Sequence, residues 1–152
     1  MKTKGIRVVD KENGHICVNL SDILKEISEG DSYFWSILYL YAFGYKGDMA
    51  SKISEDKINK SERGVLITWK DLNFFSLQYD QFIDATIIGC KDQTILKRYP
   101  EQEMYETCDI VIVMFDSSYW EIFSKDESLI NRLANKFKEV ELLESDFLNF
   151  EK

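Results

Sequence analysis

The stretch of residues 110–137, IVIVMFDSSYWEIFSKDESLINRLANKF, decides the fold class of this chain. Its first six residues are all apolar, which predicts a central strand of a sheet. Asp116-Ser117-Ser118 predicts a turn, and residues 119–123 predict the partner strand. Because a three-residue turn joins antiparallel strands, this hairpin favours an α+β fold with a largely antiparallel sheet over a doubly wound α/β sheet.

A helix is predicted directly after the hairpin. Ser124-x-x-Glu127 matches a capping box, which marks a helix N-terminus. Apolar residues then recur at helical spacing, at Leu129, Ile130, Leu133, Ala134 and Phe137. We therefore expect this helix to pack on one face of the sheet, and residues 140–143 to form a last strand.

The rest of the chain carries further elements around this unit. Residues 33–43, YFWSILYLYAF, predict a long strand with both faces covered. Thr68-x-x-Asp71 resembles a capping box and opens a predicted helix over 69–79. Residues 5–9 and 15–19 are predicted as the two strands of a hairpin around a turn at Asn13-Gly14, and residues 65–67 and 85–89 as further short strands. One helix is predicted from Leu20, with Asn19 or Ser21 as its cap and Gly30 at its end, and another over 100–107, with Pro100 in its first position.

Residues 46–64 differ in composition from their surroundings, because nine of these 19 residues are charged. We predict a mobile surface segment with one helical turn. With 152 residues, 45% of them apolar, the chain fits one globular domain over residues 1–152. The predicted fold is therefore a single α+β domain whose mixed sheet is largely antiparallel, with three to four helices.

The overall charge excludes some classes of partner. Lys and Arg number 19 and Asp and Glu number 27, a net charge of −8, which counts against binding to nucleic acid or to an anionic membrane surface. No apolar run is long enough for a membrane span or a signal peptide. The three cysteines are widely spaced, which predicts reduced thiols and a cytoplasmic protein.

Nearly all the excess charge lies between residues 99 and 127, which we call the acidic window. It holds eight acidic residues and one basic residue, a net of −7, together with Tyr99, Tyr105 and Tyr119. A focused negative field steers a basic partner, and tyrosine adds contact area at low entropy cost. The alternative is a solvated rim that only aids solubility. The predicted partner-binding residues are Glu101, Glu103, Tyr105 and Glu106, with Asp80 and Asp84 as second candidates.

Motifs for catalysis are weak. His15 and Cys17 could form a thiolate–imidazole dyad if both lay on one strand face, but two ordinary strand residues are the favoured interpretation. The G-x-x-G at residues 44–47 favours a turn over an RNA clamp. The acid pairs Asp80 with Asp84 and Glu103 with Glu106 favour solvated surface groups over a metal site. We predict no catalytic residue, no metal and no cofactor.

Two stretches resemble known families. Residues 107–137 resemble the end of an uncharacterised family of small proteins from Bacillus-type bacteria, and the opening KGIRVVDKENG with the later DILKEI resembles its start. Residues 64–89, GVLITWKDLNFFSLQYDQFIDATIIG, resemble a pattern of immunity proteins in bacterial toxin systems, including contact-dependent inhibition. This resemblance implies a small non-enzymatic protein that occludes the active site of a cognate, basic, nuclease-type toxin. The alternative is a non-enzymatic regulatory protein that binds a ligand or another partner.

Overall fold

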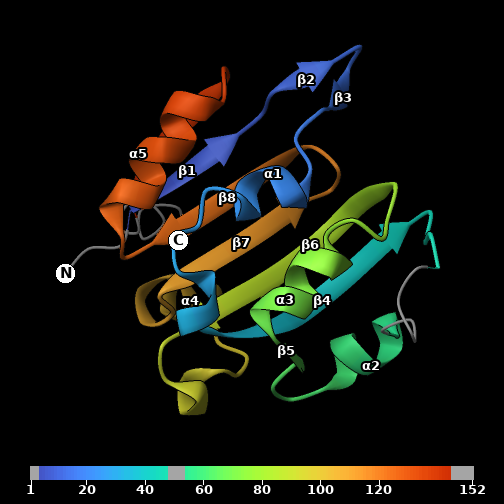
Figure 1. Ribbon diagram of the computed structural model, residues 1–152, viewed down its shortest axis with the longest axis vertical. Helices are drawn as coiled ribbons and strands as arrows, with labels where there is room; N and C mark the ends of the chain where they lie inside the picture. Colours follow the sequence, from blue (N-terminus) through green and yellow to red (C-terminus); the bar gives the residue numbers. More distant parts are fainter. Residues whose placement is uncertain (1–3, 48–53, 145–152) are drawn as a thin grey trace.

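A computed structural model describes residues 4–47 and 54–144, and the domain is built on a seven-stranded sheet (Figure 1). The strand order is β5-β4-β6-β7-β8-β1-β9, and every neighbouring pair runs antiparallel. The predicted α+β class is confirmed, with an antiparallel sheet in place of a mixed one. In chain order the strands of the large sheet are β1 (Lys4–Val8), β4 (Phe34–Phe43), β5 (Val65–Ile67), β6 (Gln81–Cys90), β7 (Ile110–Phe115), β8 (Tyr119–Ser124) and β9 (Val140–Glu144).

The hairpin predicted from the sequence is present as β7 and β8, with Phe115 opposite Tyr119. Its turn places Asp116 and Ser117 at φ of 47° and 58°, and the Ser118 N–H donates to the Phe115 carbonyl at 2.8 Å. Polar residues with short side chains are suited to this left-handed backbone, because they can bond locally to it. The turn is held down on the sheet by the Ser117 N–H, which donates to the Ile83 carbonyl at 2.8 Å.

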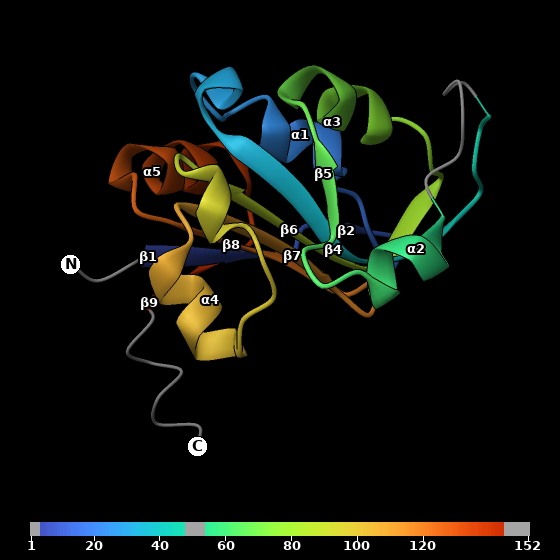
Figure 2. The ribbon, with the colours of Figure 1, turned by 90° about the horizontal axis from the view of Figure 1, so that it is seen from below.

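The helices are divided unequally between the two faces of the sheet. Figure 2 shows α1 (Leu20–Leu24), α3 (Trp69–Phe75) and α5 (Glu127–Lys136) on one face and α4 (Glu101–Thr107) on the other. The remaining helix, α2 (Glu55–Lys60), lies beside the second half of β4, with which β5 does not pair. Two 3₁₀ turns, η1 (Gly30–Ser32) and η2 (Gln93–Ile95), precede β4 and follow β6. Three helices therefore cover one face, while a single short helix is left for the other.

The larger hydrophobic core fills the space between the sheet and α1, α3 and α5. Trp35 and Trp120 are each 1% exposed, and burial of an indole requires a partner for its N–H. Trp120 Nε1 donates to the Val18 carbonyl at 2.8 Å, and Trp35 Nε1 donates to the Gly30 carbonyl at 2.9 Å. Both rings thus tie loops on the helical side to the sheet.

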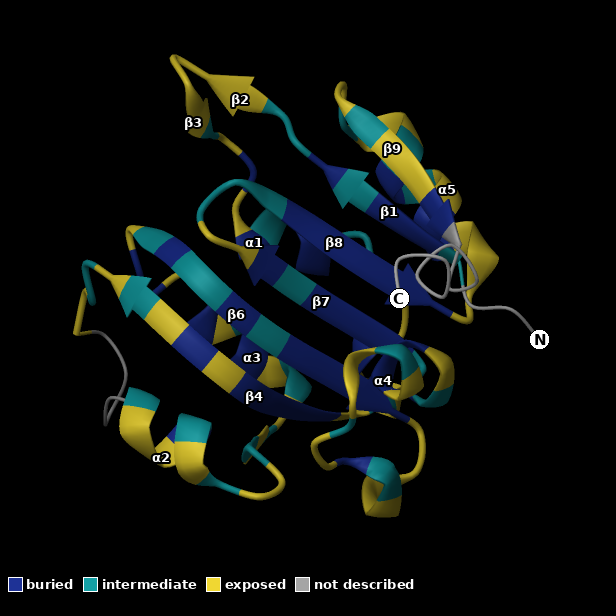
Figure 3. Ribbon diagram, turned by 180° about the vertical axis from the view of Figure 1, so that it is seen from behind, coloured by how far each residue is buried: buried dark blue, intermediate teal, exposed yellow. Residues whose placement is uncertain are grey.

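A smaller core lies under α4. Met104 and Tyr105 of this helix pack with Ile88, Val111 and Phe123 of the sheet. These sheet residues belong to the ends of β6, β7 and β8 nearest α4. Over the other half of the same face lies no helix of residues 4–47 and 54–144 (Figure 3).

Several predicted boundaries are wrong at the N-terminal side. The predicted strands 5–9 and 15–19 do not form one hairpin, because β1 lies between β8 and β9 in the large sheet. The turn at Asn13-Gly14 instead joins the short strands β2 (Lys11–Glu12) and β3 (His15–Ile16). Helix α1 ends at Leu24, and Gly30 belongs to the following 3₁₀ turn η1. Pro100 precedes α4 and does not occupy its first turn.

Two further helix ends differ from prediction for clear local reasons. The capping residue of α5 is Asp126, whose carboxylate accepts from the Ser128 N–H at 3.1 Å; Ser124 is still the last residue of β8. Helix α3 stops at Phe75, four residues before the predicted end. Its last turn tightens, with the Gln78 N–H donating to the Phe75 carbonyl at 3.0 Å, and Tyr79 then packs edge-on against Phe75.

The charged segment 46–64 is only partly described, because residues 48–53 lie outside the described residues. The part that is described is anchored, since Ile58 of α2 is fully buried. Asn59 bonds the backbone of Leu40 twice, accepting from its N–H at 3.0 Å and donating to its carbonyl at 3.2 Å. Glu55 accepts from the Ala42 N–H at 3.1 Å. Side chains of α2 thus take the place of a neighbouring strand along this part of β4.

Candidate functional site

The half of the sheet face that α4 leaves uncovered (Figure 3), which we call the open face, carries exposed aromatic residues. Tyr39, Tyr41 and Phe43 of β4 are 42%, 53% and 60% exposed, and Phe115 of β7 is 55% exposed. Phe115 stacks on Tyr119 of β8, with ring centroids 5.5 Å apart. Large apolar groups of this kind, gathered on one rigid surface, are typical of a protein-binding site.

The strand geometry explains why these rings point outward. Side chains alternate between the two faces, so core residues such as Leu40 separate Tyr39 from Tyr41. The register of β4 with β6 shifts by one residue between Ile37 and Tyr39. The extra residue brings Leu38 to the α4 side as well, next to Tyr39. The prediction that both faces of β4 are covered is therefore wrong for its second half.

A groove runs between α4 and the open face, with a cavity volume of about 450 Å³. Its floor follows one row of paired sheet residues, which in order are Tyr39, Thr86, Val113, Glu121 and Arg7. Its walls are Glu101, Met104 and Tyr105 of α4, Arg98 and Tyr99 of the preceding loop, and the Phe115–Tyr119 pair.

The charged end of the groove is built around Arg7. Its Nη2 lies 2.7 Å from Glu121 Oε2, and its Nη1 lies 3.5 Å from Glu141 Oε2. The same guanidinium lies over the Tyr119 ring, 4.5 Å from the centroid. Burial raises the pKa of Tyr119, and the carboxylates of Glu121 and Glu101 raise this pKa further. The positive charge of Arg7 lowers the pKa of Tyr119, so this ring is subject to Glu101 as well as to the Arg7–Glu121 pair.

The structure brings some of the predicted partner-binding residues to this groove. Glu101 lines it and accepts from the Tyr105 hydroxyl at 3.1 Å. Tyr105 is 2% exposed and stacks on Phe123, with centroids 4.1 Å apart, so its ring supports the groove from behind. Glu103 and Glu106 are exposed elsewhere on α4, and Glu106 accepts from the Gln102 side chain at 2.7 Å.

The second pair of predicted residues lies away from α4. Asp84 belongs to β6 opposite Tyr41, and its carboxylate accepts from the Asp116 N–H at 2.8 Å, so it fixes the β7–β8 turn. Asp80 is exposed just before β6, and its N–H donates to the carbonyls of Phe43 and Gly44. Both residues therefore border the far end of the open face, at the other end of the sheet from Glu101.

The aromatic residues of β4 and the cation Arg7 were missed by sequence reasoning. The continuous apolar run of β4 hid the outward-facing residues, because Tyr, Phe and Leu all count as apolar. A finer signal is present in the same letters: hydroxyl-bearing Tyr39 and Tyr41 alternate with Leu40 and Ala42. That alternation is typical of a strand with one face at the surface.

The residues considered for catalysis do not converge. His15 lies in β3, but Cys17 follows the strand, and both are exposed, with the Cys17 thiol 3.4 Å from the Asp10 carbonyl. Cys90 and Cys108 are buried side by side, and the hydrogen bond between their thiols, followed by burial, raises the pKa of Cys108. Within residues 4–47 and 54–144, no group of three or more His, Cys, Asp or Glu is placed to hold a metal ion.

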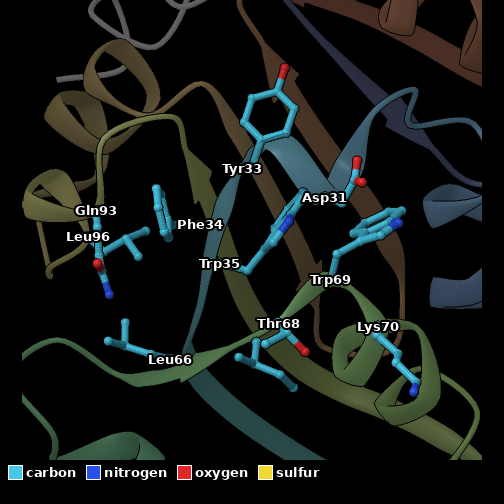
Figure 4. Close-up of a pocket in the computed structure, with 11 residues that line it drawn as sticks. Asp31, Tyr33, Phe34, Trp35, Leu66, Thr68, Trp69, Lys70, Gln93 and Leu96 are labelled. Carbon is cyan, nitrogen blue, oxygen red and sulfur yellow. The ribbon is translucent and has the colours of Figure 1, made fainter.

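A second cavity, of about 560 Å³, lies at the sheet edge where β4 begins (Figure 4). Trp35 and Trp69 stack on one side of the strand with centroids 5.3 Å apart, and Phe34 and Leu66 lie on the other side. Gly30 makes the close approach of Trp69 possible, because a Cβ at this position would lie 2.3 Å from the indole. Aromatic walls with a few polar rim groups are typical of a small-molecule site.

Comparison of the chain with protein-family models, with curated proteins and with solved structures finds no match. The resemblances seen in the sequence therefore stay predictions. Among the helices of the described residues, none is long and apolar enough to cross a membrane.

Proposed function

We propose that this chain is an immunity protein of a bacterial toxin system, which binds a basic, nuclease-type toxin domain and occludes its active site in the cytoplasm. The observation that carries the proposal is the open face, with Tyr39, Tyr41, Phe43 and Phe115 exposed on one continuous sheet. A sheet is a rigid support, so these rings lose little conformational freedom on binding. The resemblance of residues 64–89 to immunity proteins adds the biological setting.

The charge distribution supports a basic partner. The acidic window supplies α4, which borders the open face, and the hairpin β7–β8, which contributes Phe115 to it. Exposed carboxylates at such a rim accelerate association with a cationic surface, while desolvated aromatic groups at the centre slow dissociation. Blocking the active site requires no chemistry from this chain, only a complementary surface.

The test is a growth assay in which a toxin domain, encoded beside the gene for this chain, is co-expressed with it. We expect the wild-type chain to restore growth and the Tyr41→Ala/Phe115→Ala double variant to lose this protection. Phe74→Ala is the matched control, because Phe74 is 44% exposed but belongs to α3, on the opposite face. Protection that survives the double variant, or that fails equally in Phe74→Ala, would contradict the role of the open face.

The cavity at the start of β4 favours a second candidate function, a regulatory protein that binds a small ligand. The stacked indoles of Trp35 and Trp69 would form its inner wall, with Asp31 and Lys70 at the rim. A screen of aromatic metabolites, followed by Trp fluorescence and thermal unfolding, tests this candidate. A ligand that raises the melting temperature of the wild type but not of Trp69→Ala would support it.

A further inference from the structure

We infer that the groove between α4 and the open face binds the guanidinium group of one arginine side chain from a basic partner. The inference rests on the proposed function, because it names the chemistry by which the same surface recognises its toxin. It concerns the end of the groove where Glu101, Glu121 and Tyr119 meet. This end already holds a guanidinium of the chain itself, that of Arg7.

Arg7 shows how this surface binds a guanidinium group. The group lies over the Tyr119 ring, 4.5 Å from its centroid, and one of its nitrogens lies 2.7 Å from Glu121. Stacking on an aromatic ring together with an ion pair to a carboxylate is the usual way in which proteins hold arginine. The groove therefore already contains both kinds of contact at one place.

A second carboxylate at this end pairs with no cation of the described residues. Glu101 is exposed at the groove wall and, within the described part of the chain, takes part in no ion pair; its bond is to the Tyr105 hydroxyl. A hydroxyl donor leaves the negative charge of Glu101 uncompensated, and the second carboxylate oxygen remains open to a donor. A partner's guanidinium would pair with Glu101 as Arg7 pairs with Glu121.

The other charges around the groove leave this end negative. Arg98 lines the groove, but its guanidinium is directed to α2, where it donates to the carbonyls of Ser61 and Ile58 at 2.8 and 2.6 Å. The Lys97 ammonium group lies over the Tyr99 ring, 5.3 Å from the ring centroid. Among the described residues, Arg7 thus pairs with Glu121 and Glu141, while the Glu101 carboxylate acts on Tyr119 with no cation paired to it.

Arginine fits this end better than lysine. The groove is walled by planar rings, and a guanidinium is planar and weakly hydrated, so it stacks on tyrosine and bonds to a carboxylate at the same time. An ammonium group is compact and strongly hydrated, and would lose more solvation on entering a groove with apolar walls. The cavity volume of about 450 Å³ is ample for one such side chain.

The experiment titrates the full chain with N-acetyl-L-arginine amide, followed by ¹H–¹⁵N NMR. N-acetyl-L-citrulline amide is the matched probe, because it has the same shape without the charge. We expect saturable shifts at the amides of Arg7, Tyr99, Glu101 and Tyr119 with the arginine probe, and none that saturate with citrulline. Glu101→Gln should weaken the affinity about fivefold, since it removes one charged contact at a partly exposed site.

Glu12→Gln is the control variant, since Glu12 is an exposed acid of β2 that lies outside the acidic window and does not line the groove. It should leave the affinity within about twofold of wild type. Gln at position 101 can still accept from the Tyr105 hydroxyl, so the fold should persist, and an unchanged background spectrum checks this. Equal shifts from citrulline, equal loss in both variants, or tighter binding of N-acetyl-L-lysine amide would overturn the inference.

The two proposals can fail separately in these tests. If the arginine probe does not bind while Tyr41→Ala/Phe115→Ala still abolishes protection from the toxin, the inferred guanidinium site is wrong and the proposed function is still supported. If the probe binds as described but the chain protects against no basic toxin, the proposed function falls and the guanidinium site remains.

Discussion

Tyr105 supports the groove without presenting its ring to a partner. Its ring is buried against Phe123, and its hydroxyl donates to Glu101. Truncation by Tyr105→Ala should lower the free energy of unfolding by about 3 to 5 kcal/mol, as for other buried aromatic residues. Tyr105→Phe keeps the stacking and should cost about 1 kcal/mol, the value of one hydrogen bond. Urea denaturation of both variants measures the difference, and equal losses would contradict this assignment.

Tyr79 makes stability depend on pH in the alkaline range. Burial raises the pKa of Tyr79 to about 12, with a further contribution from Glu55, whereas an unfolded tyrosine ionises near pH ~10. The folded state therefore keeps the proton longer, so the stabilisation is complete below pH ~10 and is lost as the pH rises toward the folded-state pKa. In Tyr79→Phe the decline of unfolding free energy above pH ~10 should be shallower. Denaturant titrations at stepped pH test this, and parallel curves would refute it.

At the level of elements, α2 protects the edge of the sheet. Asn59 bonds both backbone groups of Leu40, which would otherwise be open to pairing with another chain. Asn59→Ala should lower the unfolding free energy by about 1 to 2 kcal/mol and promote self-association. Lys60→Ala, at an exposed position of the same helix, is the control. Light scattering at increasing protein concentration compares the self-association of the two variants. An Asn59→Ala variant that stays monomeric and as stable as the wild type would show that α2 does not protect this edge.

The sequence predicted those elements whose pattern is local. The apolar run of β7, the turn at Asp116 and the face of α5 each follow from adjacent residues, and all three are confirmed. Pairing between distant strands could not be predicted in this way, and β1 is the clearest case, because its neighbours β8 and β9 lie more than a hundred residues away. The groove depends on such pairing, since it joins Arg7 to Glu121.

For the molecule as a whole, the placement of charge should matter more than its total. Reversing Glu101, Glu103 and Glu106 to Lys changes the net charge from −8 to −2. We expect slower association with the basic partner and a weaker salt dependence of the rate, since rim charges act mainly on association. Stopped-flow kinetics at low and high salt measure both quantities.

A control reversal of acids outside the acidic window separates the effect of charge placement from the effect of net charge. Glu12, Glu62 and Glu139 are exposed acids outside the acidic window, and reversing them to Lys gives the same net charge. Association should slow less in this control, because its charges lie away from the groove. Equal slowing would mean that net charge alone steers the encounter, and unchanged rates in both would reduce the acidic window to a solvated rim.

The alternation along β7 and β8 has a consequence for how such a protein can change. Met114 and Trp120 are buried in the core, while Phe115 and Tyr119, next to them in the chain, lie on the opposite face of the sheet, where Phe115 is exposed and Tyr119 is half-buried. Outward positions can therefore be randomised in a library without touching the packing that makes the chain fold. A lineage or a designer could obtain new partner specificities on one conserved scaffold, step by step, with each intermediate still folded.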